Sequence, residues 1–293
     1  MEKILQTFKK IYQGDNIVKR HLIIPLLLLL PSMAVSFVSL IDKETPAMVS
    51  AVLVLCSIVT LILSFIPFVM LSGLGLDFCK SRLEDNNGIP AVDWSTFPKG
   101  LKALPLYIVW GIYYSILGLV FFSVPIACFI FGLSIMKENP LLFVVIIFLS
   151  LFLCFISAIL AYMVSPFMCY IFINYSSDFK YKAELFNPLS LFSYMKKAFK
   201  DTIIVLFKYL LVNMVLNTAA SLITTIFAVV LVGYIIFITI ISPEGAVYTP
   251  LNIAILTILS SIMAVFQGYV MAVTGFAMTD NVVEIYKNEI AAS

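Results

Sequence analysis

Long apolar runs, separated by shorter charged segments, set the pattern of hydrophobic and polar positions along this chain. A helix needs about 20 apolar residues to cross the roughly 30 Å hydrocarbon core of a bilayer. The runs that reach this length are 22–41, 48–76, 101–136, 141–175, 202–241 and 250–278. The pattern predicts an all-α integral membrane protein with six transmembrane helices arranged as three hairpins.

The composition of the chain agrees with lipid as its solvent. Hydrophobic residues make up 62% of the 293 positions and charged residues 12%, whereas soluble domains hold about half and about a quarter. We therefore treat 1–293 as a single membrane domain with membrane lipids as its first partners. The net charge of +2 is too small to indicate nucleic-acid binding.

The basic residues are distributed unevenly over the segments between the runs. Of the 18 Lys and Arg residues, sixteen lie in the N-terminal segment, the linkers 77–102 and 176–208, and the C-terminal tail. The opposite connections hold only Lys43 and Lys137. Because Lys and Arg are retained on the cytoplasmic side, we expect a multi-pass protein of the cell membrane with both termini cytoplasmic. The first run is too long for a signal-peptide core and is interpreted as an uncleaved membrane helix.

Several of the runs are longer than a straight span requires. At about 1.5 Å per residue, the runs 101–136 and 141–175 would form helices of roughly 50 Å. They must tilt, bend or extend beyond the hydrocarbon. We expect a bend or a stop at Pro105, Pro125, Pro166 and Gly233. The run 141–175 also carries a stripe of small residues, including Ser150 and Ser157, which indicates close helix packing.

Two short strings recur three times along the chain. In the first, a hydroxyl residue precedes an aromatic residue and a Lys follows. Its copies are Thr7-Phe8-Lys9-Lys10, Thr96-Phe97-Pro98-Lys99 and Ser193-Tyr194-Met195-Lys196. In the second, a hydroxyl residue precedes Gly or Pro late in each hairpin, and its copies are Ser72-Gly73, Ser165-Pro166 and Thr274-Gly275.

These strings predict three repeats with boundaries 1–85, 86–183 and 184–293. Each would be an amphipathic in-plane cytoplasmic segment followed by a hairpin, giving pseudo-three-fold symmetry about the membrane normal. The alternative is that short degenerate strings recur by chance in a biased composition. Superposition of the three hairpins would decide between the two.

The segment 184–200 is the clearest example of an in-plane helix. Asn187 before Pro188 suits a helix start, and large apolar residues alternate with Lys196, Lys197 and Lys200. Such a helix can lie in the membrane interface, or it can be the docking helix of a cytoplasmic partner. Both interpretations stay open.

The fifth run is the most polar and offers the main candidate site. Asn213, Asn217 and Ser221 share one face of the predicted helix, with Lys208 near its cytoplasmic end. Gln267, on the last run, could face this stripe. These five residues predict a hydrophilic groove, unless the asparagines serve only to join helices through hydrogen bonds.

Groups that carry catalysis or bind metals are scarce. His21 is the only histidine, and we expect it at the membrane interface beside Arg20. The five cysteines lack the clustered spacing of thiolate metal sites. The sequence has no P-loop, G-x-S-x-G or H-E-x-x-H string. It therefore predicts a non-enzymatic protein with no catalytic residue, no cofactor and no metal.

The linker before the third run holds both tryptophans of the chain. We expect Trp94, Phe97 and Trp110 to be interfacial anchors, because aromatic side chains concentrate at the boundary between membrane and water.

The same linker carries a family resemblance. Its string is Gly88-Ile89-Pro90, then Asp93-Trp94, Phe97 and Gly100-Leu101-Lys102-Ala103, followed by an aromatic-rich span. It resembles a bacterial and archaeal membrane-protein family, the domain of unknown function numbered 4013. The resemblance implies a six-span architecture over most of the chain, and it implies no activity and no functional residues. The sequence departs from the family at Ala91-Val92, where a more acidic stretch is expected.

These observations lead to three functional hypotheses. The first is a non-enzymatic membrane scaffold or handler of lipid or an apolar peptide, acting as a homo-oligomer or with a cytoplasmic partner subunit. The second is the permease subunit of an exporter powered by a separate ATPase, which six spans and a docking helix would fit. The third is an intramembrane enzyme, which the single histidine and sparse acidic residues disfavour.

Overall fold

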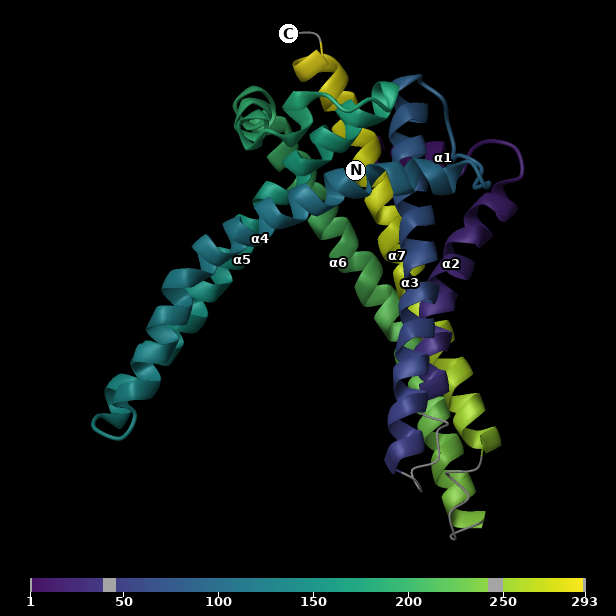
Figure 1. The fold of residues 1–293 in the computed structure, drawn as a ribbon, viewed down its shortest axis with the longest axis vertical. Coiled ribbons are helices and arrows are strands. Elements are labelled where there is room, and N and C mark those ends of the chain that lie inside the picture. The colour runs from purple at the N-terminus through teal and green to yellow at the C-terminus, as the bar shows by residue number, and fades with distance from the viewer. Residues whose placement is uncertain (1, 39–45, 242–249, 292–293) are drawn as a thin grey trace. The chain divides into compact units, whose positions relative to one another are not determined.

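Each of the six apolar runs forms a helix. The computed structural model describes the backbone of residues 2–38, 46–241 and 250–291, and side chains over most of 2–29, 58–240 and 260–291. In chain order the elements are α1 Glu2–Ile11, α2 Ile17–Val38, α3 Pro46–Leu83, α4 Thr96–Ile135, α5 Pro140–Asp178, the 3-10 turn η1 Ala183–Phe186, α6 Pro188–Ile241, α7 Pro250–Ile285 and the π-helical turn η3 Tyr286–Ala291 (Figure 1). The all-α class is confirmed, with one long helix for each predicted run.

Five of these helices are long and apolar enough, over their described residues, to cross a membrane. The qualifying stretches are Leu61–Leu83, Thr96–Ile135, Pro140–Asp178, Pro188–Phe237 and Ser260–Ala291. Most side chains of the predicted first span, on α2, fall outside the described residues. The five qualifying helices support the membrane-protein class. The count of six spans stays a prediction, because it depends on this first span.

The chain folds into two compact units, and each is described by itself. Unit 1 contains Met1–Lys102 and Phe207–Asn281, and unit 2 contains Ala103–Leu206 and Val282–Ser293. Unit 1 therefore holds α1, α2, α3, the first turns of α4, and most of α6 and α7. Unit 2 holds the rest of α4, all of α5, the start of α6 and the C-terminal turn.

In unit 2, α4 and α5 form an antiparallel hairpin (Figure 1). The rings of Tyr107 and Phe172 stack with centroids 4.4 Å apart. Further along, the Tyr114 hydroxyl donates a hydrogen bond to the Ala161 carbonyl at 3.1 Å. Gly132 lies against Ile146 near the connection between the helices. In these three contacts the residue numbers rise along α4 as they fall along α5, as an antiparallel pair requires. The contacts extend from Tyr107 to Gly132, so the helices are paired along most of their length.

Serine hydroxyls complete the hydrogen bonding of this hairpin. Because Pro125 has no N–H, it leaves the Phe121 carbonyl without its helical donor. Ser157 of α5 donates to that carbonyl at 2.7 Å, and Ser150 donates to the Pro125 carbonyl at 2.8 Å. Both serines are buried. The small-residue stripe is a packing seam, as predicted, and the Ser157 hydroxyl also replaces a lost backbone donor.

None of the residues expected to bend or stop a helix ends one. The helices continue through Pro105, Pro125, Pro166 and Gly233. None of these residues therefore acts as a stop, and a bend at any of them stays a prediction. At Pro125 and Pro166 the physical reason is that a hydroxyl supplies the missing donor. In α5, Ser165 donates to the carbonyl of Tyr162, the residue four positions before Pro166, at 2.8 Å.

α6 begins where the sequence predicts. The Leu189 N–H donates to the Asn187 side-chain oxygen at 3.0 Å, and Pro188 occupies the first helical position. Ala198 departs from helical geometry, with φ −119° and ψ 19°, which divides the helix. We call residues 188–197 the first segment of α6.

In unit 1, α3 and the first turn of α4 cross at two glycines. A Cβ atom on Gly73 would overlap the Thr96 carbonyl oxygen, and one on Gly100 would overlap the Val69 carbonyl oxygen. Lys99 pairs with an acidic residue of α3 beside this crossing, Asp77, at 2.7 Å. Close backbone contact at the two glycines therefore holds α3 against α4.

Candidate functional site

The linker between α3 and α4 is tied to the N-terminal helices. Gly88 has a positive φ of 81°, and its N–H donates to the Lys10 carbonyl at 2.8 Å. The Arg20 guanidinium donates to the carbonyl of the buried Ile89 at 3.0 Å. A side chain at Gly88 would also overlap the Gln13 carbonyl. The Gly-Ile-Pro string of this linker therefore has a structural role in unit 1.

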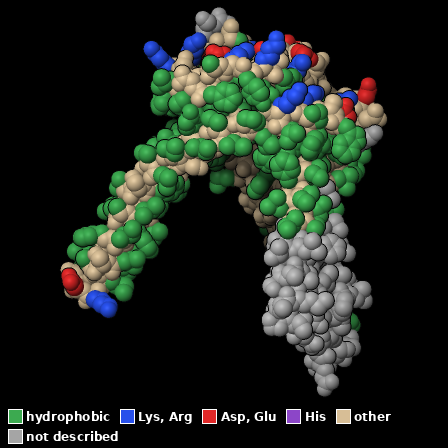
Figure 2. All heavy atoms as spheres, in the orientation of Figure 1, with side chains coloured by type: hydrophobic (Ala, Val, Ile, Leu, Met, Phe, Trp, Pro, Cys, Tyr) green, Lys and Arg blue, Asp and Glu red, His purple; other side chains and the backbone are tan. Residues whose placement is uncertain are grey.

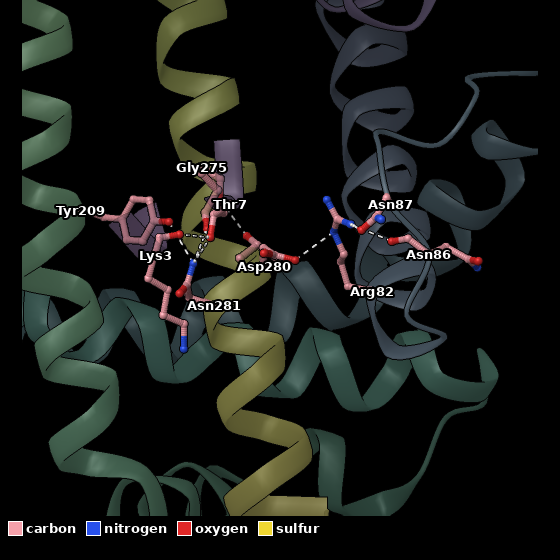
Figure 3. Close-up of polar contacts among 11 residues, drawn as sticks. Lys3, Thr7, Arg82, Asn86, Asn87, Tyr209, Gly275, Asp280 and Asn281 are labelled. Atoms are coloured by element: carbon pink, nitrogen blue, oxygen red, sulfur yellow. Dashed lines mark hydrogen bonds and ion pairs between the residues drawn. The ribbon is translucent and has the colours of Figure 1, made fainter. Parts of the chain in front are cut away.

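Arg82, near the end of α3, is the centre of a buried charged cluster (Figure 3). Its side chain is 4% exposed and its Nε lies 2.9 Å from a carboxylate oxygen of Asp280 on α7. Its Nη1 donates to the Asn86 carbonyl at 2.6 Å and to the Asn87 side chain at 3.3 Å. The guanidinium also lies over the Phe78 ring, 4.8 Å from its centroid. This cluster joins α3, α7 and the linker, and it places Asp280 in a protein interior contact.

Asn281, the next residue on α7, joins two further helices (Figure 3). Its side-chain nitrogen donates to the Thr7 hydroxyl of α1 at 3.1 Å and to the Tyr209 hydroxyl of α6 at 2.9 Å. The same nitrogen lies 3.1 Å from the Ala277 carbonyl. Because one amide nitrogen carries two hydrogens and has three acceptors here, one hydrogen is shared. The face of α1 that carries Thr7 and the buried Ile11 therefore docks on protein.

His21 lies in a second polar contact of unit 1. Its ring stacks on Tyr12 at 4.4 Å, and its Nδ1 lies 2.8 Å from the Tyr269 hydroxyl of α7. Its Nε2 lies 3.4 Å from the Ile11 carbonyl, which can only accept. In the neutral ring Nε2 is therefore the donor and Nδ1 accepts from Tyr269. Burial lowers the pKa of His21, and its hydrogen bond to Ile11 opposes this shift. His21 thus packs inside unit 1, where the sequence predicted an interfacial cap.

The five residues of the predicted polar groove differ in burial and in contacts. Asn217 donates to the Asn213 side chain at 2.9 Å, and both residues are half-buried on α6. Lys208 and Ser221 are exposed. Gln267 is half-buried on α7, and among the described side chains no hydrogen bond joins it to either asparagine. The groove stays a prediction, and the one contact made within it is between neighbouring turns of a single helix.

The three predicted anchors have different surroundings. Trp94, in the linker, is 83% exposed, and Phe97, in the first turn of α4, is half-buried. Trp110 is 2% exposed, and its indole N–H donates to the Leu185 carbonyl of η1 at 2.6 Å. Trp110 therefore packs inside unit 2 and holds the connection between α5 and α6.

Sequence reasoning missed a polar cluster in unit 2. The Asn174 side-chain nitrogen lies 3.3 Å from a carboxylate oxygen of Glu184 and 3.2 Å from the Tyr194 hydroxyl. Lys182 donates to the Asn174 side-chain oxygen at 3.3 Å. The signal that could have found this cluster is the position of Asn174 at the end of an apolar run, beside a basic segment. Asn281 has a similar position after the last run. Among the described side chains, the asparagines chosen from the sequence, at positions 213 and 217, bond within α6 alone.

The described part of the chain holds no group of three His, Cys, Asp or Glu side chains that could bind a metal ion. Comparisons with known proteins gave no match, whether to family models, to curated proteins or to solved structures.

Proposed function

We propose that this chain is a six-span protein of the cell membrane that acts without catalysis, as a scaffold or as a handler of lipid or an apolar peptide. α2 would be the sixth span beside the five helices that meet the criteria of length and hydropathy. An even number of spans places both termini on one side. The strong excess of Lys and Arg in the segments on that side supports a cytoplasmic location.

The observation that carries the proposal is the apolar surface of the α4–α5 hairpin. Leu119 on α4 and Phe148 on α5 are each 69% exposed. Many other large apolar side chains along both helices are exposed as well, and they cover the visible face of the hairpin (Figure 2). Soluble monomers rarely expose apolar patches of this extent. Lipid tails or an apolar peptide would cover this surface.

Photocrosslinking of the intact protein in its native membrane tests this proposal. A benzoylphenylalanine in place of Phe148 should form adducts with lipid or an apolar peptide, whereas one in place of the buried Phe167 should form few. An unreactive position 148 would contradict the proposal. So would hydrolysis or chemical modification of lipid by the purified protein without added partners.

A second candidate function is the permease subunit of an exporter driven by a separate ATPase. The first segment of α6 favours it, because a short amphipathic helix with an exposed face on the basic side could dock a cytoplasmic subunit. Co-purification of a stoichiometric ATPase with the full chain would support this candidate. Loss of that ATPase after substitution of Phe192 would place the contact on the first segment.

The family resemblance and the three-fold repeat remain part of the proposal. Two glycines of the family string have structural roles: Gly88 has positive φ and Gly100 lies at the crossing of α3 and α4. These roles support the string as a marker of architecture. Superposition of the α2–α3, α4–α5 and α6–α7 hairpins in an experimental structure would test the repeat.

A further inference from the structure

The first segment of α6 has apolar residues on two opposite faces. One face packs within unit 2 through the buried Leu191 and Tyr194, and Ala198 at the kink that follows is buried as well. The other face carries Leu189, which is 68% exposed, and Phe192, which is 63% exposed. A helix that needed only to cover unit 2 would require one apolar face. The exposed face therefore needs a second apolar environment.

The orientation of this segment is fixed by its buried side. The Tyr194 hydroxyl accepts a hydrogen bond from Asn174 of α5 at 3.2 Å, and the Tyr194 ring lies 5.9 Å from that of Tyr170. After the kink, Thr202 is bound both to the Ala198 carbonyl and to the Tyr170 hydroxyl, at 2.5 Å and 2.6 Å. The face bearing Leu189 and Phe192 is consequently held outward.

The charges within residues 188–200 are all of one sign, and the exposed Asp201 follows this stretch directly. Lys196, Lys197 and Lys200 are exposed, and the stretch 188–200 contains no acidic residue. The exposed Phe199 lies between two of these lysines in the sequence. Exposed Leu and Phe flanked by Lys match the chemistry of a membrane surface, where apolar side chains enter the acyl boundary and Lys contacts phosphate.

Chain continuity places this segment near such a surface. The same helix passes through the kink at Ala198 into a run that is long and apolar enough to span a membrane. The three lysines lie two to six residues before the predicted boundary at 202, which is the region where headgroups lie. Lys side chains there gain from negative lipid charge and gain little from zwitterionic lipid.

We infer that residues 188–200 form a binding site for anionic phospholipid on the cytoplasmic leaflet. Leu189, Phe192 and Phe199 enter the acyl boundary, and Lys196, Lys197 and Lys200 bind headgroup phosphates. The site is separate from the apolar surface of the α4–α5 hairpin. It requires that the chain be embedded in a membrane, and it does not depend on what the hairpin handles.

Position-specific photocrosslinking of the full chain tests the inference. The protein carries benzoylphenylalanine in place of Phe192 and is reconstituted in nanodiscs of phosphatidylcholine mixed with anionic phosphatidylglycerol. Mass spectrometry of the peptide that contains residue 192 then counts adducts with each lipid. We expect adducts to favour phosphatidylglycerol well beyond its share of the mixture. The same probe in place of Tyr194, which faces inward, should give almost none.

Charge variants distinguish binding of anionic lipid by these three lysines from the attraction of anionic lipid to the basic side of the protein as a whole. A contribution of about 1 kcal/mol corresponds to a fivefold effect for each lysine, so K196Q/K197Q/K200Q should reduce the preference for phosphatidylglycerol at residue 192 by roughly a hundredfold. The matched control K9Q/K10Q/K180Q removes three exposed lysines from other segments of the basic side and should leave the preference intact.

Two results would overturn the inference. One is a yield of adducts at residue 192 in which each lipid appears only in proportion to its share of the mixture. The other is crosslinking of residue 192 to a second polypeptide in native membranes, which would make this face a protein docking site. The probe at Phe148 reports on the hairpin independently, so failure at residue 192 and failure of the proposed function are distinguishable.

Discussion

At the scale of single residues, a few buried polar side chains hold helices that are otherwise joined by apolar contact. Arg82 and Asp280 are the charged example, and Asn281 is the neutral one. Burying an ion pair gains little net stability, but removing one partner leaves a charge without compensation. These residues should therefore be more sensitive to substitution than any exposed pair.

Asp280→Asn should lower the free energy of unfolding by about 3–5 kcal/mol, because Arg82 stays buried without its counter-charge. Unfolding monitored in mild detergent would measure the loss. The matched control is Lys80→Gln, since Lys80 and Glu84 form an exposed pair at 4.0 Å, and such pairs contribute about 1 kcal/mol or less. Equal effects of the two substitutions would contradict the importance of the buried cluster.

The pH dependence of stability should contain a contribution from His21. Its pKa is lowered by burial in the folded protein, so the unfolded chain binds the proton first, near its ordinary pKa of about 6.5. Stability is therefore complete above that pH and falls as the pH drops through it toward the folded pKa. Thermal unfolding across this range should show the loss, and His21→Gln should remove that part of the slope.

At the scale of helices, the sequence predicted the apolar runs well and their ends poorly. The run 48–76 becomes part of a helix that ends at Leu83, and the run 202–241 belongs to one that begins at Pro188. Hydropathy marks where lipid can cover a helix, whereas backbone hydrogen bonding continues into polar sequence until a cap or a turn intervenes. Backbone hydrogen bonding also continues past Pro125 in α4 and Pro166 in α5, because a serine hydroxyl replaces the N–H that each proline lacks.

A double-mutant cycle at Pro125 and Ser157 should reveal this compensation. Ser157→Ala in the native chain leaves the Phe121 carbonyl unpaired and should cost about 0.6–1.7 kcal/mol. In a Pro125→Ala background the helix regains its own N–H donor, so Ser157→Ala should cost less. Ser123→Ala is the control, because its exposed hydroxyl bonds, among the described residues, to the Val120 carbonyl of its own helix. Additive costs for Pro125 and Ser157 would refute the compensation.

The crossing of α3 and α4 should be sensitive to one added methyl group. Gly73→Ala or Gly100→Ala would drive a Cβ into a backbone carbonyl and should destabilise unit 1 by about 1–3 kcal/mol or more. Gly75→Ala, two residues from Gly73 on the same helix, meets no atom within 4 Å and should be neutral or slightly stabilising. Thermal unfolding of the three variants would compare them directly.

At the scale of the whole molecule, topology follows from the number of spans and from the distribution of Lys and Arg. Six spans predict that fluorescent tags at both termini lie in the cytoplasm. Cysteines introduced at Lys43 and Lys137 should react with an impermeant thiol reagent in intact cells, whereas a cysteine at Ser95 should not. A C-terminus that is open to protease on the outer face of intact cells would refute this topology.

The sequence by itself determined the class, the six helices and the expected orientation, because hydropathy and the positions of Lys and Arg are local properties that each segment carries alone. It also identified Asn187 and Pro188 as a helix start. The tertiary structure decided which polar residues meet. Asn281 and Asn174 join helices, whereas among the described side chains Asn213 and Asn217 bond to each other within one helix, and Trp110 packs inside while Trp94 is exposed. These outcomes depend on the rotation and register of each helix against its neighbours, which side-chain packing sets and which a single run of residues does not encode.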